Sequence, residues 1–145
     1  MMKELIDILV SGNHSLVVGN NLVVGNNNVR TFDGRGVSDL FRLLENDPEF
    51  LDGARVADKV VGKGAAALMI LGGVKEVYSM VISDPAFALF EKYGVKVSFG
   101  KRVEHIINRK GDDICPVEKL CADCVTPEEC LPLIKGFIQC MNHNG

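Results

Sequence analysis

Residues 57–99 alternate between apolar strands and helices, and this alternation constrains the fold more than any other feature. The most apolar segment, ADKVVGKGAAALMILGG at residues 57–73, favours a helix that the Gly-Gly pair ends, and Val60 and Val61 can belong to a strand leading into it. VKEVYSMVIS predicts a buried strand, SDPAFALFEKYG a short helix and VKVSF another strand. Such alternation is typical of α/β proteins.

The N-terminal part predicts a helix and a hairpin. Leu5, Ile6, Leu9 and Val10 recur at helical spacing, and Gly12 is placed to cap that helix. Two copies of LVVGNN then predict a hairpin, because Gly and Asn tolerate the positive φ of tight turns. The following VRTF continues the second strand or starts a third. GVSDLFRLLEND predicts a further helix.

The C-terminal part predicts two helices. CPVEKLCADC places Pro116 at the first position of one helix. TPEECLPLIKGFIQC begins the other with a capping box from Thr126 to Glu129, and Pro132 is expected to kink or delay it. All the elements together predict a single domain over residues 1–145, a three-layer α/β/α sandwich with a mixed sheet.

Composition excludes several classes of protein. The net charge of −3 gives no basic surface for nucleic acid, and no stretch approaches the roughly 20 apolar residues of a membrane span. The N-terminus MMKELIDILV lacks a signal-peptide cleavage site, so we expect a cytoplasmic protein with no nucleic-acid or membrane partner. Five cysteines, an odd number, fit reduced thiols better than a disulfide scaffold.

Four stretches carry a family resemblance: SLVV, ADKVVGKGAAAL, VYSMVIS with FALFEKYGVK, and INRKGDDICPVEK. With the order of elements they resemble the cytidine-deaminase-like fold, and more closely an uncharacterised bacterial family with that fold, over most of residues 14–119. The resemblance implies zinc-ligand positions near Gly62–Gly64 and Ser83–Pro85. Neither place supplies His, Cys or Glu, and Lys63 would set a cation beside the metal. We therefore expect no catalytic zinc and no other cofactor.

The same resemblance implies a small-molecule pocket at the helix N-termini near Lys63 and Ser83, walled by the turn from Arg109 to Cys115. A cation at a glycine-flanked helix start suits a nucleotide-like or otherwise anionic ligand, and a guanidinium suits carboxylate or phosphate. Structural alternatives are a solvated lysine, simple helix capping and an arginine that braces the sheet edge. The expected ligand-binding residues are Asp58, Gly62, Lys63, Ser83, Asp84, Asn108 and Arg109.

Cys115 is the best candidate nucleophile. It precedes Pro116 and so is predicted at a helix N-cap, where the helix dipole favours a thiolate. In a metal-independent enzyme Cys115 would attack the substrate, Lys63 would steady negative charge, and Glu118 would carry a proton or cap the turn. In a non-catalytic binding or regulatory module Cys115 would be a pocket wall or a buried small residue. A homodimer through an exposed sheet edge or helix face would fit such a module.

The competing hypothesis is a metal or thiol-redox site in the cysteine-rich helical segment 115–145. Cys115, Cys121, Cys124 and Cys130 have spacings of six, three and six, with one CxxC where zinc ribbons have two. As an i, i+3 pair on a helix, Cys121 and Cys124 can reach one metal or form a strained disulfide. The alternative is a set of inert, semi-buried small hydrophobes.

Overall fold

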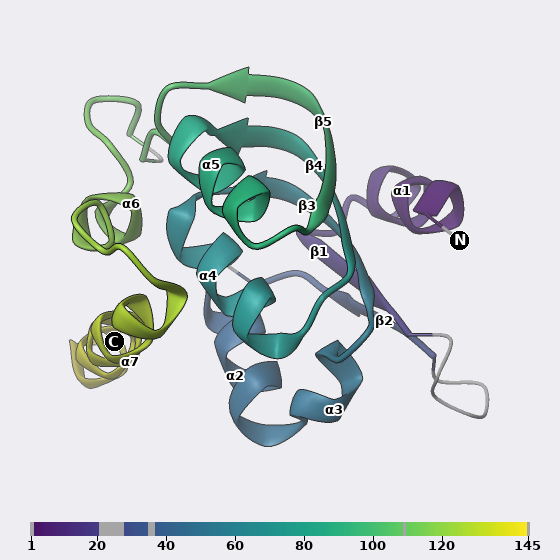
Figure 1. Ribbon diagram of the computed structural model, residues 1–145, viewed down its shortest axis with the longest axis horizontal. Coiled ribbons are helices and arrows are strands. Elements are labelled where there is room, and N and C mark those ends of the chain that lie inside the picture. Colours follow the sequence, from purple (N-terminus) through teal and green to yellow (C-terminus); the bar gives the residue numbers. More distant parts are fainter. Residues whose placement is uncertain (1, 21–27, 35–36, 109, 145) are drawn as a thin grey trace.

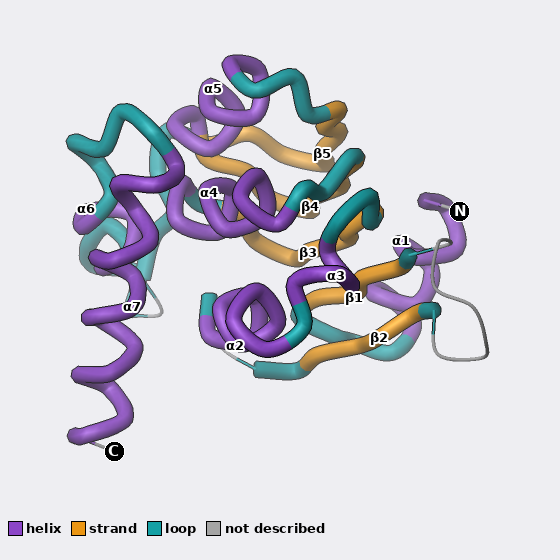
Figure 2. The backbone as a smooth tube through the Cα atoms, turned by 60° about the horizontal axis from the view of Figure 1, so that its bottom comes forward, coloured by secondary structure: helices purple, strands orange, loops and turns teal. Residues whose placement is uncertain are grey.

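Five strands form one mixed sheet in the described part of the chain (Figures 1 and 2). The computed structural model describes residues 2–20, 28–34, 37–108 and 110–144, and of 141–144 the backbone only. The strand order is β2-β1-β3-β4-β5, with β1 antiparallel to β2 and β3, and with β3, β4 and β5 parallel. The α/β class and the mixed sheet are thus confirmed. The strands are β1 (Leu16–Gly19), β2 (Val29–Phe32), β3 (Arg55–Val61), β4 (Glu76–Ser83) and β5 (Lys96–Val103).

Helices cover the two faces of the sheet unequally. Helix α1 (Met2–Ser11) packs on one face, where Leu5 and Leu9 form a small core with Val17 and Ala57. None of the described helices is both long and apolar enough to cross a bilayer. The remaining helices lie on the other side of the sheet (Figure 1): α2 (Ser38–Asn46), α3 (Pro48–Leu51), α4 (Lys63–Gly72), α5 (Asp84–Lys92), α6 (Pro116–Leu120) and α7 (Pro127–Asn144).

Helix α4 is the centre of the larger core. It lies between the sheet and α7 (Figure 1), and its residues from Gly64 to Met69 are buried. A helix that is apolar on all sides needs such cover. The tightest approach is at Gly64, where an added Cβ would lie 2.4 Å from Cγ1 of Val117. Glycine therefore lets α6 pack directly against the start of α4.

The first LVVGNN copy forms a strand, but its partner in the structure is VRTF and the prediction for the second copy stays a prediction. Strands β1 and β2 pair antiparallel, so VRTF forms the strand beside β1. The second LVVGNN copy occupies residues 22–27, which lie outside the described residues. The residue with positive φ after α1 is Asn13, at 52°, and not Gly12. Asparagine tolerates this left-handed conformation, so it takes the capping role predicted for the glycine.

The C-terminal predictions are partly corrected. Helix α6 ends before Cys121, so Cys121 and Cys124 lie in a turn and not on a helix. Helix α7 begins directly after Thr126 and contains Pro132, so the proline does not delay it. The capping box is confirmed at one of its two bonds, because the backbone N–H of Glu129 donates to Oγ1 of Thr126 at 3.3 Å.

Candidate functional site

The carboxylate of Glu118 lies where the N-termini of two helices meet. Helices α4 and α5 follow the parallel strands β3 and β4, so both begin at the same edge of the sheet. Glu118 is 3% exposed, and its Oε1 accepts hydrogen bonds from the backbone N–H of Lys63 at 2.8 Å and from Oγ of Ser83 at 2.9 Å. Its Oε2 accepts from the backbone N–H of Ile106 at 2.5 Å. This carboxylate and its three donors are called the Glu118 site below.

Local sequence explains why the carboxylate fits. Gly62 is the N-cap of α4 and offers no side-chain acceptor, so Glu118 supplies one from another helix. A Cβ on Gly62 would lie 3.2 Å from Oε1 of Glu118, closer than most such contacts. Ser83 is the N-cap of α5; its hydroxyl accepts from the N–H of Ala86 at 3.2 Å and donates to Glu118. Negative charge beside two helix N-termini is favourable.

The side chain of Lys63 binds a different segment from the one that its backbone N–H binds. Its Nζ donates to the carbonyl oxygen of Ala122 at 3.1 Å and to that of Cys124 at 2.5 Å. The ammonium group thus holds the turn that follows α6, while the N–H of the same residue holds Glu118.

Cys115 occupies the predicted N-cap of α6, half-buried. Its N–H donates to the carbonyl oxygen of Ile106 at 2.7 Å, and the N–H of Ile106 donates to Glu118. Ile106 therefore connects the N-cap of α6 to the Glu118 site. No hydrogen bond in the described chain joins the Cys115 thiol to Lys63 or Glu118. The catalytic roles expected for these three residues stay predictions.

Asp84 binds a partner outside the Glu118 site. The carboxylate of Asp84, at the first residue of α5, accepts from Nε of Arg102 at 2.6 Å. The guanidinium of Arg102 also lies over the ring of Phe87, 4.2 Å from its centroid. Nothing in the sequence pattern pointed to this partner, since the pair joins β5 to α5. Arg109 lies outside the described residues.

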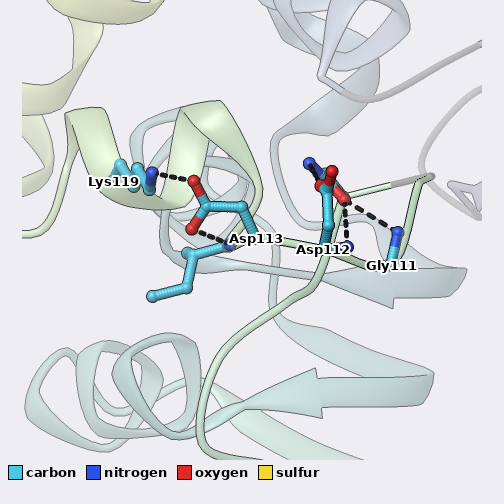
Figure 3. A network of polar contacts seen from close by, with 6 residues as sticks. Gly111, Asp112, Asp113 and Lys119 are labelled. Carbon is cyan, nitrogen blue, oxygen red and sulfur yellow. Dashed lines mark hydrogen bonds and ion pairs between the residues drawn. The ribbon is translucent and has the colours of Figure 1, made fainter.

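Asn108 folds the loop that precedes α6, and Figure 3 labels two of its partners, Gly111 and Asp112. Its Oδ1 accepts from the N–H groups of Gly111 at 2.9 Å and Asp112 at 3.3 Å, and its Nδ2 donates to Oδ1 of Asp112 at 2.9 Å. At the other end of the loop Asp113 forms an ion pair with Lys119, and this hydrogen bond lowers the pKa of Asp113. The described contacts of Asn108 are therefore structural, and its predicted contact with a ligand stays a prediction.

Asp58 lies inside β3 and away from the strand end where the Glu118 site begins. Burial raises the pKa of its carboxyl to about 7, although its Oδ1 accepts from the N–H of Val60 at 3.3 Å. Its neighbour on β4 is the buried Ser79, whose hydroxyl donates to the carbonyl oxygen of Val81 at 2.5 Å. In the described chain no cation pairs with Asp58, so its charge is disfavoured at neutral pH.

Two shallow hollows on the surface lie elsewhere. One, of about 270 Å³, lies between β2 and α2, and the other, of about 310 Å³, lies beside α3 and the end of α4. Neither is lined by a residue of the Glu118 site. A ligand that binds the donors of the Glu118 site has to displace the Glu118 carboxylate, because that buried carboxylate already accepts from them. The first hollow is lined by Arg30, Phe32, Asp39, Arg42, Leu43, Asn46 and Asp47.

A zinc ion of the deaminase type does not fit the Glu118 site. The implied positions hold Lys63, whose amine is bound to carbonyl oxygens, and Ser83, whose hydroxyl is bound to Glu118. Both Glu118 oxygens already face N–H or O–H donors. Across the described residues, no three His, Cys, Asp or Glu side chains are placed to hold a metal ion.

The cysteines of the predicted cluster lie in or against the larger core: Cys121 and Cys130 are buried in it, and Cys124 packs against it. The sulfur of Cys130 lies 3.7 Å from the carbonyl oxygen of Thr126, and all three are free thiols. Cys115 makes no hydrogen bond to any of them in the described chain.

Comparison with known proteins gives a family and a fold. The family model TM1506, a domain of unknown function (DUF1893), matches residues 4–138. The crystal structure of a DUF1893 family protein (TM1506) from Thermotoga maritima has a TM-score of 0.82 to this chain and covers 93% of it, with 88% of that chain covered. The two are 24% identical, so the likeness shows the fold alone. No curated protein matches this chain.

Proposed function

Because this chain belongs to the DUF1893 family of unknown function, we propose a function from the geometry of the Glu118 site. The protein binds a small anionic molecule at the N-termini of α4 and α5, and the Glu118 carboxylate holds that place until the ligand displaces it. The observation that carries the proposal is a carboxylate, 3% exposed, that is bound by donors from three separate segments.

The donors match an anion by their chemistry. Backbone N–H groups at a helix N-terminus bind phosphate and carboxylate, and the helix dipole adds a favourable field. The edge formed by the carboxyl ends of parallel strands is also where α/β proteins commonly bind ligands. A nucleotide-like ligand follows only from the resemblance of the fold, so the commitment is to a phosphate or carboxylate group.

Displacement of Glu118 is feasible because α6 is short. Glu118 lies on a helix of five residues that is preceded by the exposed loop around Asn108. Breaking a hydrogen bond to a charged group costs about 1.5–3 kcal/mol, and a bound anion regains the same bonds. The exchange is therefore nearly balanced, and contacts with the rest of the ligand set the affinity.

A thermal-shift titration tests the proposal with three proteins: the wild type, Glu118→Ala and Glu129→Ala. The probes are acetate, inorganic phosphate and cytidine monophosphate at constant ionic strength. Glu129 is the matched control, because its carboxylate also accepts from a backbone N–H, that of Val125 at 2.9 Å, but in an exposed place. A ligand at 100 times its Kd stabilises the folded state by about 2.7 kcal/mol.

We expect saturable stabilisation of the wild type by phosphate or the nucleotide. Glu118→Ala should respond at lower concentration and also to acetate, because the competing carboxylate is gone, while Glu129→Ala should behave as the wild type. A response by Glu118→Ala alone would show that Glu118 is a permanent structural cap. No response from either protein would show that the site does not bind anions, and both results refute the proposal.

A further inference from the structure

We propose that the outer edge of β5 binds an extended peptide in which acidic and apolar residues alternate, so that the peptide adds a strand to the sheet. The proposal concerns different residues from those of the Glu118 site and stands without any ligand there.

The outer edge of β5 is open. The strand is the last in the order β2-β1-β3-β4-β5 and pairs with β4 alone. In Figure 1 no helix or strand of the described chain lies beyond it. Apart from the pairing with β4, no backbone hydrogen bond involves residues 96–103 in the part of the chain that the structure describes. An edge strand turns alternate N–H and C=O groups away from its sheet, so β5 presents a row of them to a partner.

The two faces of β5 differ in chemistry. Val97 packs against the larger core, and the ring of Phe99 meets that of Phe87 on α5, with the centroids 5.7 Å apart. Successive side chains of a strand point to opposite faces, so Lys96 and Ser98 lie on the other face. Phe99 is still 38% exposed, and an apolar side chain on an added strand can cover it. The face towards α5 is therefore apolar, and the opposite face is polar.

Lys101 adds a second cation to the polar face. Arg102 lies on the face towards α5, because its guanidinium contacts an aromatic ring of that helix, and its neighbour Lys101 therefore lies on the opposite face. Arg102 is paired with Asp84, whereas no ion pair joins Lys101 to any described residue. The side chain of Lys96 is 81% exposed, with its Nζ 3.7 Å from the carboxylate of Glu76. Both lysines can thus meet carboxylates from a partner.

Charge selects the kind of partner. Residues 96–103 contain three cations and no acidic residue. A second copy of β5 would bring three more cations to the same edge, and like charges across a strand pair are destabilising. A peptide with carboxylates beside Lys96 and Lys101 is favoured, and its alternate apolar side chains then lie beside Val97 and Phe99. Main-chain hydrogen bonds supply the affinity of such a complex, and the alternate side chains supply its selectivity.

Fluorescence anisotropy at pH 7 tests the proposal with the full chain and three labelled peptides of seven residues. In the first peptide Glu alternates with Val, and in the second Lys replaces each Glu. The third is the first with every backbone nitrogen methylated, which keeps the carboxylates and removes the N–H donors. The protein variants are Lys101→Glu and, as the matched control, Lys3→Glu. Lys3 is exposed on α1, which packs against β1 and β3, and both substitutions change the net charge equally.

We expect the wild type to bind the Glu–Val peptide saturably, and to bind neither the Lys–Val peptide nor the methylated one. Lys101→Glu should raise the Kd about fivefold or more, because an attractive pair across the strands becomes a repulsive one. Lys3→Glu should leave the Kd unchanged.

Four results would overturn the inference. Absence of saturable binding of the Glu–Val peptide would show that the lysines only protect the edge. Equal affinity for the methylated peptide would show attraction by charge without strand addition, and equal losses in the two variants would show an effect of net charge alone. A dimer in sedimentation velocity that Lys101→Glu strengthens would show that a second copy covers this edge.

Discussion

Replacing Glu118 with glutamine tests the Glu118 site atom by atom, because the two side chains have the same shape. With its carbonyl oxygen in the place of Oε1, glutamine still accepts from Lys63 and Ser83. Its amide nitrogen then faces the N–H of Ile106, where Oε2 had accepted at 2.5 Å, and two donors meet. The flipped amide is worse, because its nitrogen faces the other two donors.

The cost of Glu118→Gln follows from these contacts. An N–H left without an acceptor away from solvent costs about 1–3 kcal/mol, and that of Ile106 is partly buried. The two remaining bonds change from charge-assisted to neutral, which weakens them by about 1 kcal/mol each. We therefore expect the free energy of unfolding to fall by about 3 kcal/mol or more. For a domain of this size, that corresponds to a decrease in Tm of roughly 10 °C.

Urea denaturation followed by far-UV circular dichroism at pH 7 measures this difference. Glu129→Gln is the control, since its exposed carboxylate caps α7 at Val125 and should cost no more than about 1 kcal/mol. A loss below about 1 kcal/mol for Glu118→Gln, with an unchanged denaturant slope, would refute the reasoning. It would mean that the bond from Ile106 contributes little and that the site needs only one acceptor oxygen.

Three further perturbations have expected signs. Burial raises the pKa of Asp58 from 3.8 in the unfolded chain to about 7, so between these two pH values the folded state holds a proton that the unfolded chain has lost. The free energy of unfolding is therefore highest below about pH 4, falls by about 4 kcal/mol in total as pH rises to 7, and is flat above. Asp58→Asn should abolish that decline in urea midpoints, and a wild-type midpoint independent of pH would contradict it. Gly64→Ala should lower the free energy of unfolding by about 1–3 kcal/mol, because the new Cβ clashes with Val117. Gly136→Ala on α7 has open space for its Cβ and should raise it by about 0.5–1 kcal/mol. Equal effects of the two substitutions in thermal melts would show that the packing at Gly64 is loose. Alkylation of Cys124 by iodoacetamide should still rise about tenfold per pH unit between pH 8 and 10, and a plateau near pH 9 in peptide mass spectrometry would show an ordinary thiol.

The parts of the fold that the sequence predicts are those coded by local pattern. The alternation through residues 57–99 predicts α4, β4, α5 and β5, because periodicity and turn residues act over a few positions. The end of α6 was missed because CPVEKLCADC continues a helical pattern that the turn at Cys121 interrupts. Lys63 holds that turn from another helix, and this tertiary contact leaves no local signal.

The sequence predicts several residues of the Glu118 site but not the hydrogen bonds that join them. Gly62, Lys63, Ser83 and Glu118 were identified from helix starts, and the structure brings them together. Their hydrogen bonds were not predicted, because Glu118 accepts from the first N–H of α4 and from the hydroxyl of Ser83, which caps α5. The third donor is the backbone N–H of Ile106, and a backbone group carries no residue-type signal that a pattern can detect.

Lys63 links the Glu118 site to the turn that follows α6. Its N–H donates to Glu118, while its Nζ donates to the carbonyl oxygen of Cys124, and Glu118 lies on the helix that leads into that turn. Because the bonds of one residue hold both the carboxylate and the turn, we expect a ligand that displaces Glu118 to loosen the turn as well. Hydrogen exchange of the Cys124 N–H with and without phosphate measures this effect, and equal protection in both conditions would show that the turn is held independently of Glu118.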